Sequence, residues 1–401
     1  MIVAARLEQG RPSALIRIMV AAASMCLAAV AILDGLDRIS AERPGVARRV
    51  PALFASEAHL ARARIALESG DGKAALVEAE AAVDAAPLDP GSSATLGAAR
   101  LALQQNRSAQ SAFRIAGKLG WRIFFTQAYW MQRALAVGDY SVAAMRLDAL
   151  ARQDPALLRH HELLDPFEAN PAGQAALAKR LAVAPWRVAY AADTSGLPPG
   201  MLAQRGLVLA ELARQGTVLG CRTIAPAVSG LLDQRALVDA SALWRSHCPD
   251  ARSTLIYDGD FVAAITDDDR NDFAWSFIGQ SDLAMVLTPA DEGKGQQVAV
   301  DSTAQRRSLF LRQLLLVPPG IYRLSWRAQT ADGNPSSAAV PLVFCEGAPE
   351  TEVAGIHSPT ADRWSGILTI DKACPAHWLG FAVRPGPSRF TLSSIRLAVE
   401  R

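Results

Sequence analysis

The sequence has few of the residue patterns that mark an enzyme or a metal protein. Its five cysteines include no C-x-x-C pair, so zinc and redox motifs of that kind are not expected. Gly-rich phosphate loops and Ser-His-Asp motifs are missing. No pair of acidic residues is identified by its spacing as the two catalytic carboxylates that a glycosidase needs. The sequence therefore predicts no catalytic residue, no metal and no cofactor, and a protein that is not an enzyme.

An excess of charge of one sign is also missing. The chain has 41 Lys and Arg against 39 Asp and Glu, a net charge of +2, which gives no electrostatic basis for binding nucleic acid. Aromatic residues make up only 6% of the chain, but half of it is hydrophobic, which is more than a disordered protein contains. Its 401 residues suffice for two or three domains.

One histidine pair invites a metal interpretation. His160 and His161 precede Glu162, but a metalloprotease helix needs the pattern H-E-x-x-H. Asp165 stands where the second histidine would be, and Pro166 interrupts the helix. We expect no metal site here.

The N-terminal region contains one long apolar run. Residues 14–33 are apolar except for Arg17 and Ser24, and about 20 such residues can span a membrane as a helix. Arg6, Arg11 and Arg17 lie on its N-terminal side, so the positive-inside rule predicts that residues 1–13 are cytoplasmic and that the body lies across the inner membrane, in the periplasm. A cleaved signal peptide is the alternative interpretation, because residues 29–31 (Ala-Val-Ala) fit a cleavage site.

A 34-residue repeat organises the following region. Similar residues recur at this step in four sets: Ala63, Gly97 and Met131; Ala75, Ala109 and Ala143; Ala79, Phe113 and Leu147; Ala82, Ala116 and Leu150. Such a period is typical of stacked helix-turn-helix units, in which small residues allow two helices to approach closely. We expect a linker over 34–54 and an α-solenoid over 55–252, with its clearest repeats at 56–155.

This order of small and bulky positions, closed by Pro87 and Pro155, resembles the tetratricopeptide repeat. The resemblance implies a scaffold that binds other proteins. Candidate docking residues are the aromatic cluster Trp121, Phe125, Tyr129 and Trp130. The competing interpretation, which we favour, is that these rings fill the seam between repeats.

From residue 253 to 401 the pattern changes to short apolar runs between turn residues. Eight such runs are expected to be strands, at 285–287, 297–300, 309–311, 322–326, 340–344, 366–370, 379–383 and 390–398. This number of short strands predicts an all-β sandwich of the jelly-roll type.

The C-terminal region contains an ordered series of core and turn positions: Asp258-Gly259-Asp260-Phe261, Phe273-Ala274-Trp275, Gln313, Pro318 to Leu324, Cys345, Trp364 and Cys374. This series resembles the carbohydrate-binding-module-like, galactose-binding-like sandwiches of bacterial envelope proteins. The family often holds a structural calcium, but Val262 and Ser393-Ser394 stand where acidic ligands would be. The acidic run at 267–269 is expected to be a solvated loop.

Sugar binding needs exposed aromatic faces, and the candidates are Trp326, Trp364 and Trp378. Trp275 is expected in the core, and for each of the others the core is the competing interpretation. If the body is exported, we also expect two disulfides, Cys221–Cys248 and Cys345–Cys374, with free buried thiols as the alternative.

Together these patterns predict a non-catalytic, membrane-anchored scaffold that supports surface polysaccharide assembly or export. Its expected partners are other envelope proteins and the membrane, with a polysaccharide as a further candidate. The alternatives are a glycan-binding accessory protein and a carbohydrate-active enzyme.

Overall fold

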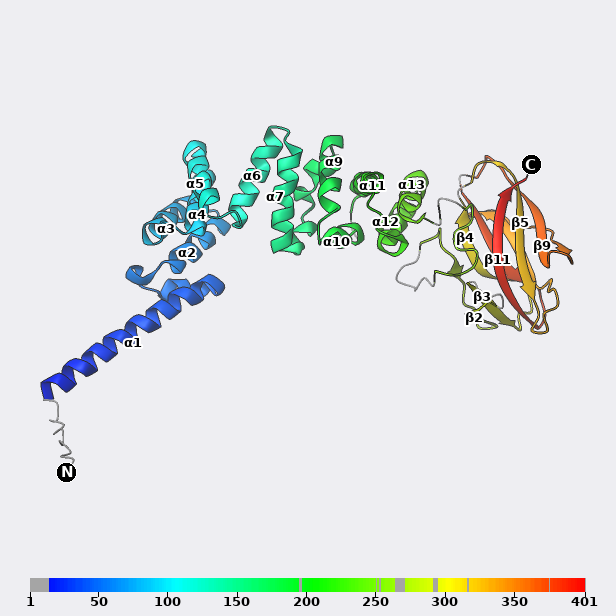
Figure 1. Ribbon diagram of the computed structural model, residues 1–401, viewed down its shortest axis with the longest axis horizontal. Coiled ribbons are helices and arrows are strands. Elements are labelled where there is room, and N and C mark those ends of the chain that lie inside the picture. The colour runs from blue at the N-terminus through cyan, green and yellow to red at the C-terminus, as the bar shows by residue number, and fades with distance from the viewer. Residues whose placement is uncertain are drawn as a thin grey trace, which may run out of the picture. The chain divides into compact units, whose positions relative to one another are not determined.

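The computed structural model describes residues 14–194, 197–249, 251, 254–263, 271–290, 295–315, 317–374 and 376–400 (Figure 1). The chain forms two compact units, Met1–Leu150 and Ala151–Arg401. It contains an apolar N-terminal helix, a helical region and an all-β C-terminal sandwich, which confirms the predicted multidomain architecture. The predictions for residues 1–13 and for the acidic run at 267–269 lie outside the described residues.

The apolar N-terminal run forms helix α1, Ala14–Glu42. The helix is long and apolar enough to cross a membrane, and none of its most apolar 18 residues is buried. Apolar side chains exposed along such a length are unfavourable in water and favourable in a bilayer. A signal sequence has the same properties, so the helix is compatible with both predicted roles.

The segment after the apolar run is folded, and the prediction of a linker over 34–54 is wrong. Helix α1 continues to Glu42, and two short 3-10 helices follow, Pro44–Arg49 and Ala52–Phe54. Apolar side chains of this segment, including Leu36, Ala47 and Val50, pack together with the start of the first repeat. Packing of this kind fixes the chain because it buries apolar surface on both sides.

A buried carboxylate completes this joint. Asp37 of α1 accepts hydrogen bonds from the backbone N–H groups of Ser56, Glu57 and Ala58, at 3.2, 3.1 and 2.8 Å. These groups open helix α2 (Glu57–Glu68), and the first N–H groups of a helix have no partner within the helix itself. The negative charge also complements the helix dipole. Asp37 therefore ties the N-terminal helix to the first repeat.

Helix pairs follow with the predicted period. The first helices of the pairs are α2, α4 (Pro90–Ala102) and α6 (Phe124–Ala136), and the second are α3 (Gly72–Ala85), α5 (Asn106–Leu119) and α7 (Tyr140–Gln153). The second helices begin at 72, 106 and 140, which are 34 residues apart each time. The 34-residue helical period is confirmed, whereas membership of the tetratricopeptide family stays a prediction.

The small residues of the repeat lie where helices approach most closely. Ala75, Ala109 and Ala143 are fully buried. A Cβ atom on Gly97 would come within 2.9 Å of the Phe113 ring, so α4 and α5 could not pack as they do around a larger side chain. The predicted role of small residues at helix crossings is confirmed at this position.

The second unit begins with further helices. They are α8 (Asp165–Glu168), α9 (Pro171–Leu181), α10 (Arg187–Ala192), α11 (Pro199–Arg214), α12 (Cys221–Asp233) and α13 (Leu237–His247), preceded by short 3-10 turns at Pro155–Arg159 and His161–Leu163. The period of 34 residues does not continue here. The structure therefore confirms a helical region up to the sandwich but not further regular repeats.

The sandwich consists of two antiparallel sheets. One has the order β1-β4-β10-β6-β7 and the other the order β2-β3-β11-β5-β9-β8. The strands are β1 (Ser276–Phe277), β2 (Leu283–Pro289), β3 (Gln296–Ser302), β4 (Ser308–Leu315), β5 (Gly320–Gln329), β6 (Ala339–Cys345), β7 (Thr351–Glu352), β8 (Ile356–Ser358), β9 (Arg363–Ile370), β10 (His377–Val383) and β11 (Ser388–Val399). All eight predicted strands are present, and the three additional ones among the described residues, β1, β7 and β8, have only two or three residues. Such short strands carry too little alternation to be recognised from sequence.

Candidate functional site

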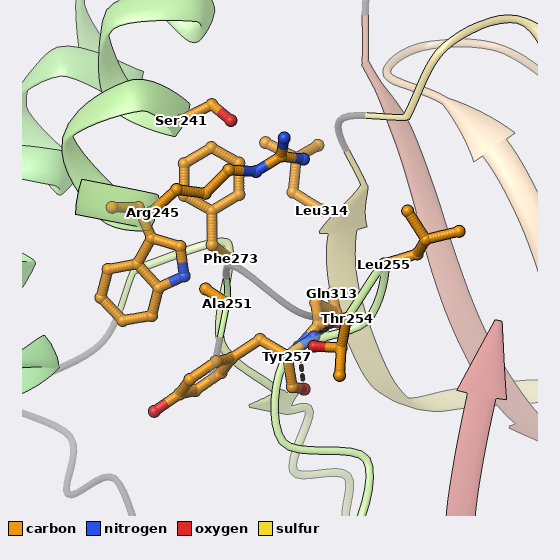
Figure 2. A pocket seen from close by; sticks show the side chains of 10 residues that line it. Ser241, Arg245, Ala251, Thr254, Leu255, Tyr257, Phe273, Gln313 and Leu314 are labelled. Atoms are coloured by element: carbon orange, nitrogen blue, oxygen red, sulfur yellow. Dashed lines mark hydrogen bonds between the residues drawn. The ribbon is translucent and has the colours of Figure 1, made fainter. Parts of the chain in front are cut away.

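A small pocket lies where α13 meets the sandwich (Figure 2). Trp244 of α13 packs against Tyr257 with ring centroids 5.1 Å apart, and it lies 6.5 Å from Phe273. Arg245 and Leu314 also line the pocket, and their side chains lie near each other (Figure 2). The cavity has a volume of about 30 Å³, which leaves room for little more than a water molecule. This pocket is a packed joint rather than a ligand site.

Gln313 explains how the joint is fixed. Its side-chain amide donates to the carbonyl of Tyr257 at 2.9 Å and accepts from the N–H of the same residue at 3.2 Å (Figure 2). Both groups are buried, and a buried amide that lost these bonds would pay the full cost of desolvation. Gln313 of β4 therefore joins the sandwich to the segment that follows α13.

The structure places Trp326 in the core of the sandwich. Trp326 is 1% exposed, it stacks on Trp364 at 6.4 Å, and its ring meets Phe381 edge-on at 6.1 Å. Trp326 and Trp364 are direct partners across β5 and β9, so both side chains point inward. The prediction that Trp326 stacks on a glycan is wrong. Trp364 is only half-buried but packs against this core, and Trp275 is buried as expected.

Trp378 lies on the outer face of its sheet, but its ring is covered. It is 8% exposed and stacks on Phe344 with centroids 6.5 Å apart. The guanidinium of Arg312 lies 4.3 Å from the centre of the indole, a cation–π contact. Because these neighbours cover the ring, Trp378 presents no open face to a pyranose, and this prediction is also wrong.

The outer face of the other sheet is open. An open hollow of about 470 Å³ is lined by apolar and polar residues of β2, β3 and β11 and one residue of the loop after β5, which are Ala284, Val286, Ala299, Val300, Asp301, Ala331, Arg389, Phe390 and Thr391. Ala284 and Ala299 leave the space, since larger residues at these positions would fill it. Arg389 donates to Asp301 at 2.7 Å at its edge. Its volume is typical of small-molecule sites.

A second polar group lies on the same sheet, on β5, on β8 and at the turn before β9. Asp362 accepts a hydrogen bond from the Gln329 amide at 2.7 Å. Its carboxylate also lies 3.5 Å from Arg327 Nε and 3.6 Å from His357 Nε2. Gln329 is the strand partner of Thr391, so the group is continuous with the hollow. Together they offer amide, hydroxyl and charged groups that can hydrogen-bond the hydroxyls of a glycan.

The aromatic cluster of the repeats divides into buried and exposed members. Tyr129 is buried and stacks on Phe113 at 4.2 Å, so it fills the seam, and the alternative of docking at Tyr129 is wrong. Phe125 and Trp130 are half-buried against the same cluster. Trp121 is 46% exposed, with the Arg146 guanidinium 4.2 Å from its ring centre. Of the four candidates, Trp121 is the most accessible.

Both predicted cysteine pairs are joined in the structure. Cys221–Cys248 and Cys345–Cys374 are disulfides with Cα atoms 4.9 and 6.0 Å apart, while Cys26 is free. His161 interacts with Asp165 at 3.4 Å, and both lie at the surface. His160 is exposed as well. The pattern around the histidine pair therefore forms ordinary surface contacts.

Sequence reasoning missed several polar residues. Asp301, Arg389 and Asp362 alternate with core residues along their strands or turns, a pattern that predicts exposure but not a shared site. His377 was also missed, although it follows Cys374 at the C-x-x-H spacing. Burial lowers the pKa of His377, and the negative charge of Asp371 opposes this shift.

Similarity to known proteins is found among solved structures. No protein-family model matches the chain, and no curated protein matches it. The enzymatically active domain of bacteriophage CBA120 tailspike protein 4 matches 32% of this chain and 19% of its own, with 7% identity and a TM-score of 0.23. The carbohydrate-binding module TmCBM61, solved with β-1,4-galactotriose, matches 31% of this chain and 88% of its own, with 18% identity and a TM-score of 0.21.

The chain thus spans about a fifth of the tailspike domain. At these TM-scores the likeness carries no argument about what the protein binds or does.

Proposed function

We propose that the protein is a non-catalytic scaffold anchored in the inner membrane, with its body in the periplasm. The repeats dock other envelope proteins, and the assembly supports the synthesis or export of a surface polysaccharide. The observation that carries this proposal is the joint at Asp37, where three backbone N–H groups of α2 bind a carboxylate of α1. A helix that enters the first repeat without a linker holds that repeat next to the bilayer.

The distance from the span to the joint supports this arrangement. Asp37 follows the apolar run 14–33 by four residues, which is about 6 Å along a helix at 1.5 Å per residue. The first repeat would therefore lie close to the membrane surface, where membrane-embedded partners are accessible. Exposed aromatic residues in the repeats, Trp121 and Phe124, suit protein contacts, because such residues anchor many interfaces.

Glycan binding is the second candidate function, and the hollow on the sheet of β2, β3 and β11 favours it. In this alternative the glycan hydroxyls accept hydrogen bonds from Arg389, donate to Asp301 and exchange hydrogen bonds with Thr391, and no tryptophan stacks on the sugar. Both functions can coexist, since the hollow and the exposed aromatics lie in different units.

The test uses the full-length protein, cross-linked in intact cells and purified from membranes. We expect specific envelope proteins to co-purify with the wild type, and Trp121→Ala together with Phe124→Ala to reduce their yield at least fivefold. Val137→Ala is the matched control, because Val137 is an exposed apolar residue of the same array. Equal yields from both variants, or no specific partner, would contradict docking through Trp121 and Phe124.

The same purified protein is then applied to an array of surface polysaccharides. Saturable binding that Arg389→Ala weakens, and Arg384→Ala directly after β10 of the other sheet does not, would support the glycan-binding function. Release of new reducing ends from any of these polysaccharides would overturn the non-catalytic assignment.

A further inference from the structure

Two cysteines and a histidine converge at one end of the sandwich. His377 opens β10 and is the direct strand partner of Cys345, which closes β6. Cys374 precedes His377 by three residues and approaches the same point from the loop. One ligand atom from each of the three residues lies within 4.8 Å of the others.

The surroundings hold these side chains in place and leave one side accessible. Cys374 and His377 are buried, whereas Cys345 is half-buried. Asp371 accepts hydrogen bonds from the N–H groups of Ala373 and Cys374, at 2.8 and 3.3 Å, and so fixes the loop that carries Cys374. A preorganised set of donors with an opening to solvent is what an ion needs to enter and be bound.

The chemistry of the three donors selects the ion. Thiolates and imidazole are the preferred ligands of zinc, which binds them in tetrahedral geometry. Three protein ligands leave one position for water, as in zinc sites that remain open. Oxygen-seeking ions such as calcium and magnesium are disfavoured by this donor set.

The other cysteine pair provides an internal comparison. Among the described residues, no third ligand atom joins Cys221 and Cys248. The neighbouring His247 is buried with both ring nitrogens engaged, one accepting from the Leu219 N–H at 3.2 Å and the other donating to the Leu209 carbonyl at 2.9 Å. This pair is therefore suited to a disulfide alone, unlike the pair beside His377.

We propose that Cys345, Cys374 and His377 bind one zinc ion when the Cys345–Cys374 disulfide is reduced. A dithiol reductant supplies two electrons and two protons, which convert the disulfide to two thiols while the dithiol itself becomes a disulfide. Zinc then displaces both thiol protons and forms bonds to two thiolates and one nitrogen of the neutral imidazole. The S–S bond and the metal bonds use the same sulfur atoms, so the two states exclude each other.

The site makes the end of the sandwich responsive to thiol reductants. In the oxidised state the disulfide joins β6 to the loop before β10. In the reduced state the metal would join the same two segments and would also bind β10 through His377. The inference does not depend on the proposed scaffold function, because it concerns only the sandwich.

The test uses full-length protein in detergent, reduced with dithiothreitol, freed of reductant without oxygen, and titrated with Co²⁺ and then Zn²⁺. We expect one thiolate-ligated, tetrahedral Co²⁺ per chain, displaced by Zn²⁺, and none in the oxidised protein. Cys345→Ser with Cys374→Ser should abolish binding, whereas Cys221→Ser with Cys248→Ser should leave it unchanged. His377→Asn should weaken Zn²⁺ binding at least tenfold, since even ligand-supporting residues contribute about that much.

A second measurement on the wild type guards against variants that fail to fold. Zn²⁺ should protect Cys345 and Cys374 of the reduced protein from alkylation, mapped by mass spectrometry, while Cys221 and Cys248 keep their rate. Two results would each overturn the proposal: Co²⁺ spectra without thiolate charge transfer, or equal alkylation of all four cysteines with and without Zn²⁺.

Discussion

A buried ion pair holds the helices of the second unit together at the scale of single residues. Glu168 accepts hydrogen bonds from Tyr190 at 2.6 Å and from Arg205 Nε at 3.0 Å, and both charged side chains are 2% exposed. Arg205 also donates to the Asp193 carbonyl at 2.6 Å. Burial, followed by the charge of Glu168, raises the pKa of Tyr190 well above its usual value, so its hydroxyl stays a donor.

Removing one member of this pair should be costly. We expect Arg205→Met to lower the free energy of unfolding of the second unit by about 3–5 kcal/mol, because it leaves the Glu168 carboxylate buried without a counter-ion. Urea unfolding, with hydrogen exchange of the amides in α8, α10 and α11, measures the effect. The control is Arg389→Met, which breaks the exposed pair with Asp301 and should cost about 0–1 kcal/mol. Equal losses would show that the buried pair makes no special contribution.

At the scale of elements, the middle repeat is the one that departs from its neighbours. The turns of the outer repeats have Gly70 and Gly138 in the left-handed region, at φ of 78° and 74°, but the middle repeat has Gln104 there, at φ 60°. Asp71 and Asp139 then cap the next helix, each accepting one backbone N–H at 3.0 Å, whereas Gln105 makes no such bond. The middle turn thus lacks both features that favour its conformation.

Restoring these residues should stabilise the array. We expect Gln104→Gly with Gln105→Asp to raise the free energy of unfolding of the repeats by about 1–2 kcal/mol, from relief of the left-handed conformation and a new helix cap. Gly70→Gln in the first repeat is the matched control. It should lower the free energy of unfolding by about as much as Gln104→Gly alone raises it. Thermal unfolding of the full chain measures both. No gain from the double variant would contradict this account of the turn.

At the scale of the whole molecule, orientation in the membrane is the property that charge leaves undecided. Arg6, Arg11 and Arg17 lie before or early in α1, but the C-terminal side carries Arg38, Arg43, Arg48 and Arg49. The positive-inside rule compares both sides, so it does not by itself support the cytoplasmic N-terminus that the arginines before the span led us to expect. The two cysteine pairs favour a body outside the cytoplasm, because disulfides persist in oxidising compartments.

Reporter fusions test on which side of the membrane the body lies. We expect a phosphatase that is active only in the periplasm to be active when fused after residue 401, and a cytoplasmic reporter fused there to be inactive. Protein alkylated in cells before lysis should show Cys221, Cys248, Cys345 and Cys374 protected as disulfides. The reverse reporter pattern would place the body in the cytoplasm and contradict the predicted localisation.

Element type and order could be read from the sequence because they depend on local spacing. The 34-residue step between Ala75, Ala109 and Ala143 specifies paired helices, and alternation over short runs specifies the strands of the sandwich. The apolar run 14–33 specifies a helix in the same way. These patterns are read from spacing along the chain alone, so they can be recognised without any knowledge of the tertiary structure.

The tertiary structure alone decided which side chains are accessible and which meet. Trp326 is buried because Trp364, 38 residues away, is its strand partner, and Trp378 is covered because Arg312 lies over it. His377 meets Cys345 only through the register of β10 with β6. Strand order, register and the burial of each face follow from pairing between distant segments, which local spacing does not encode.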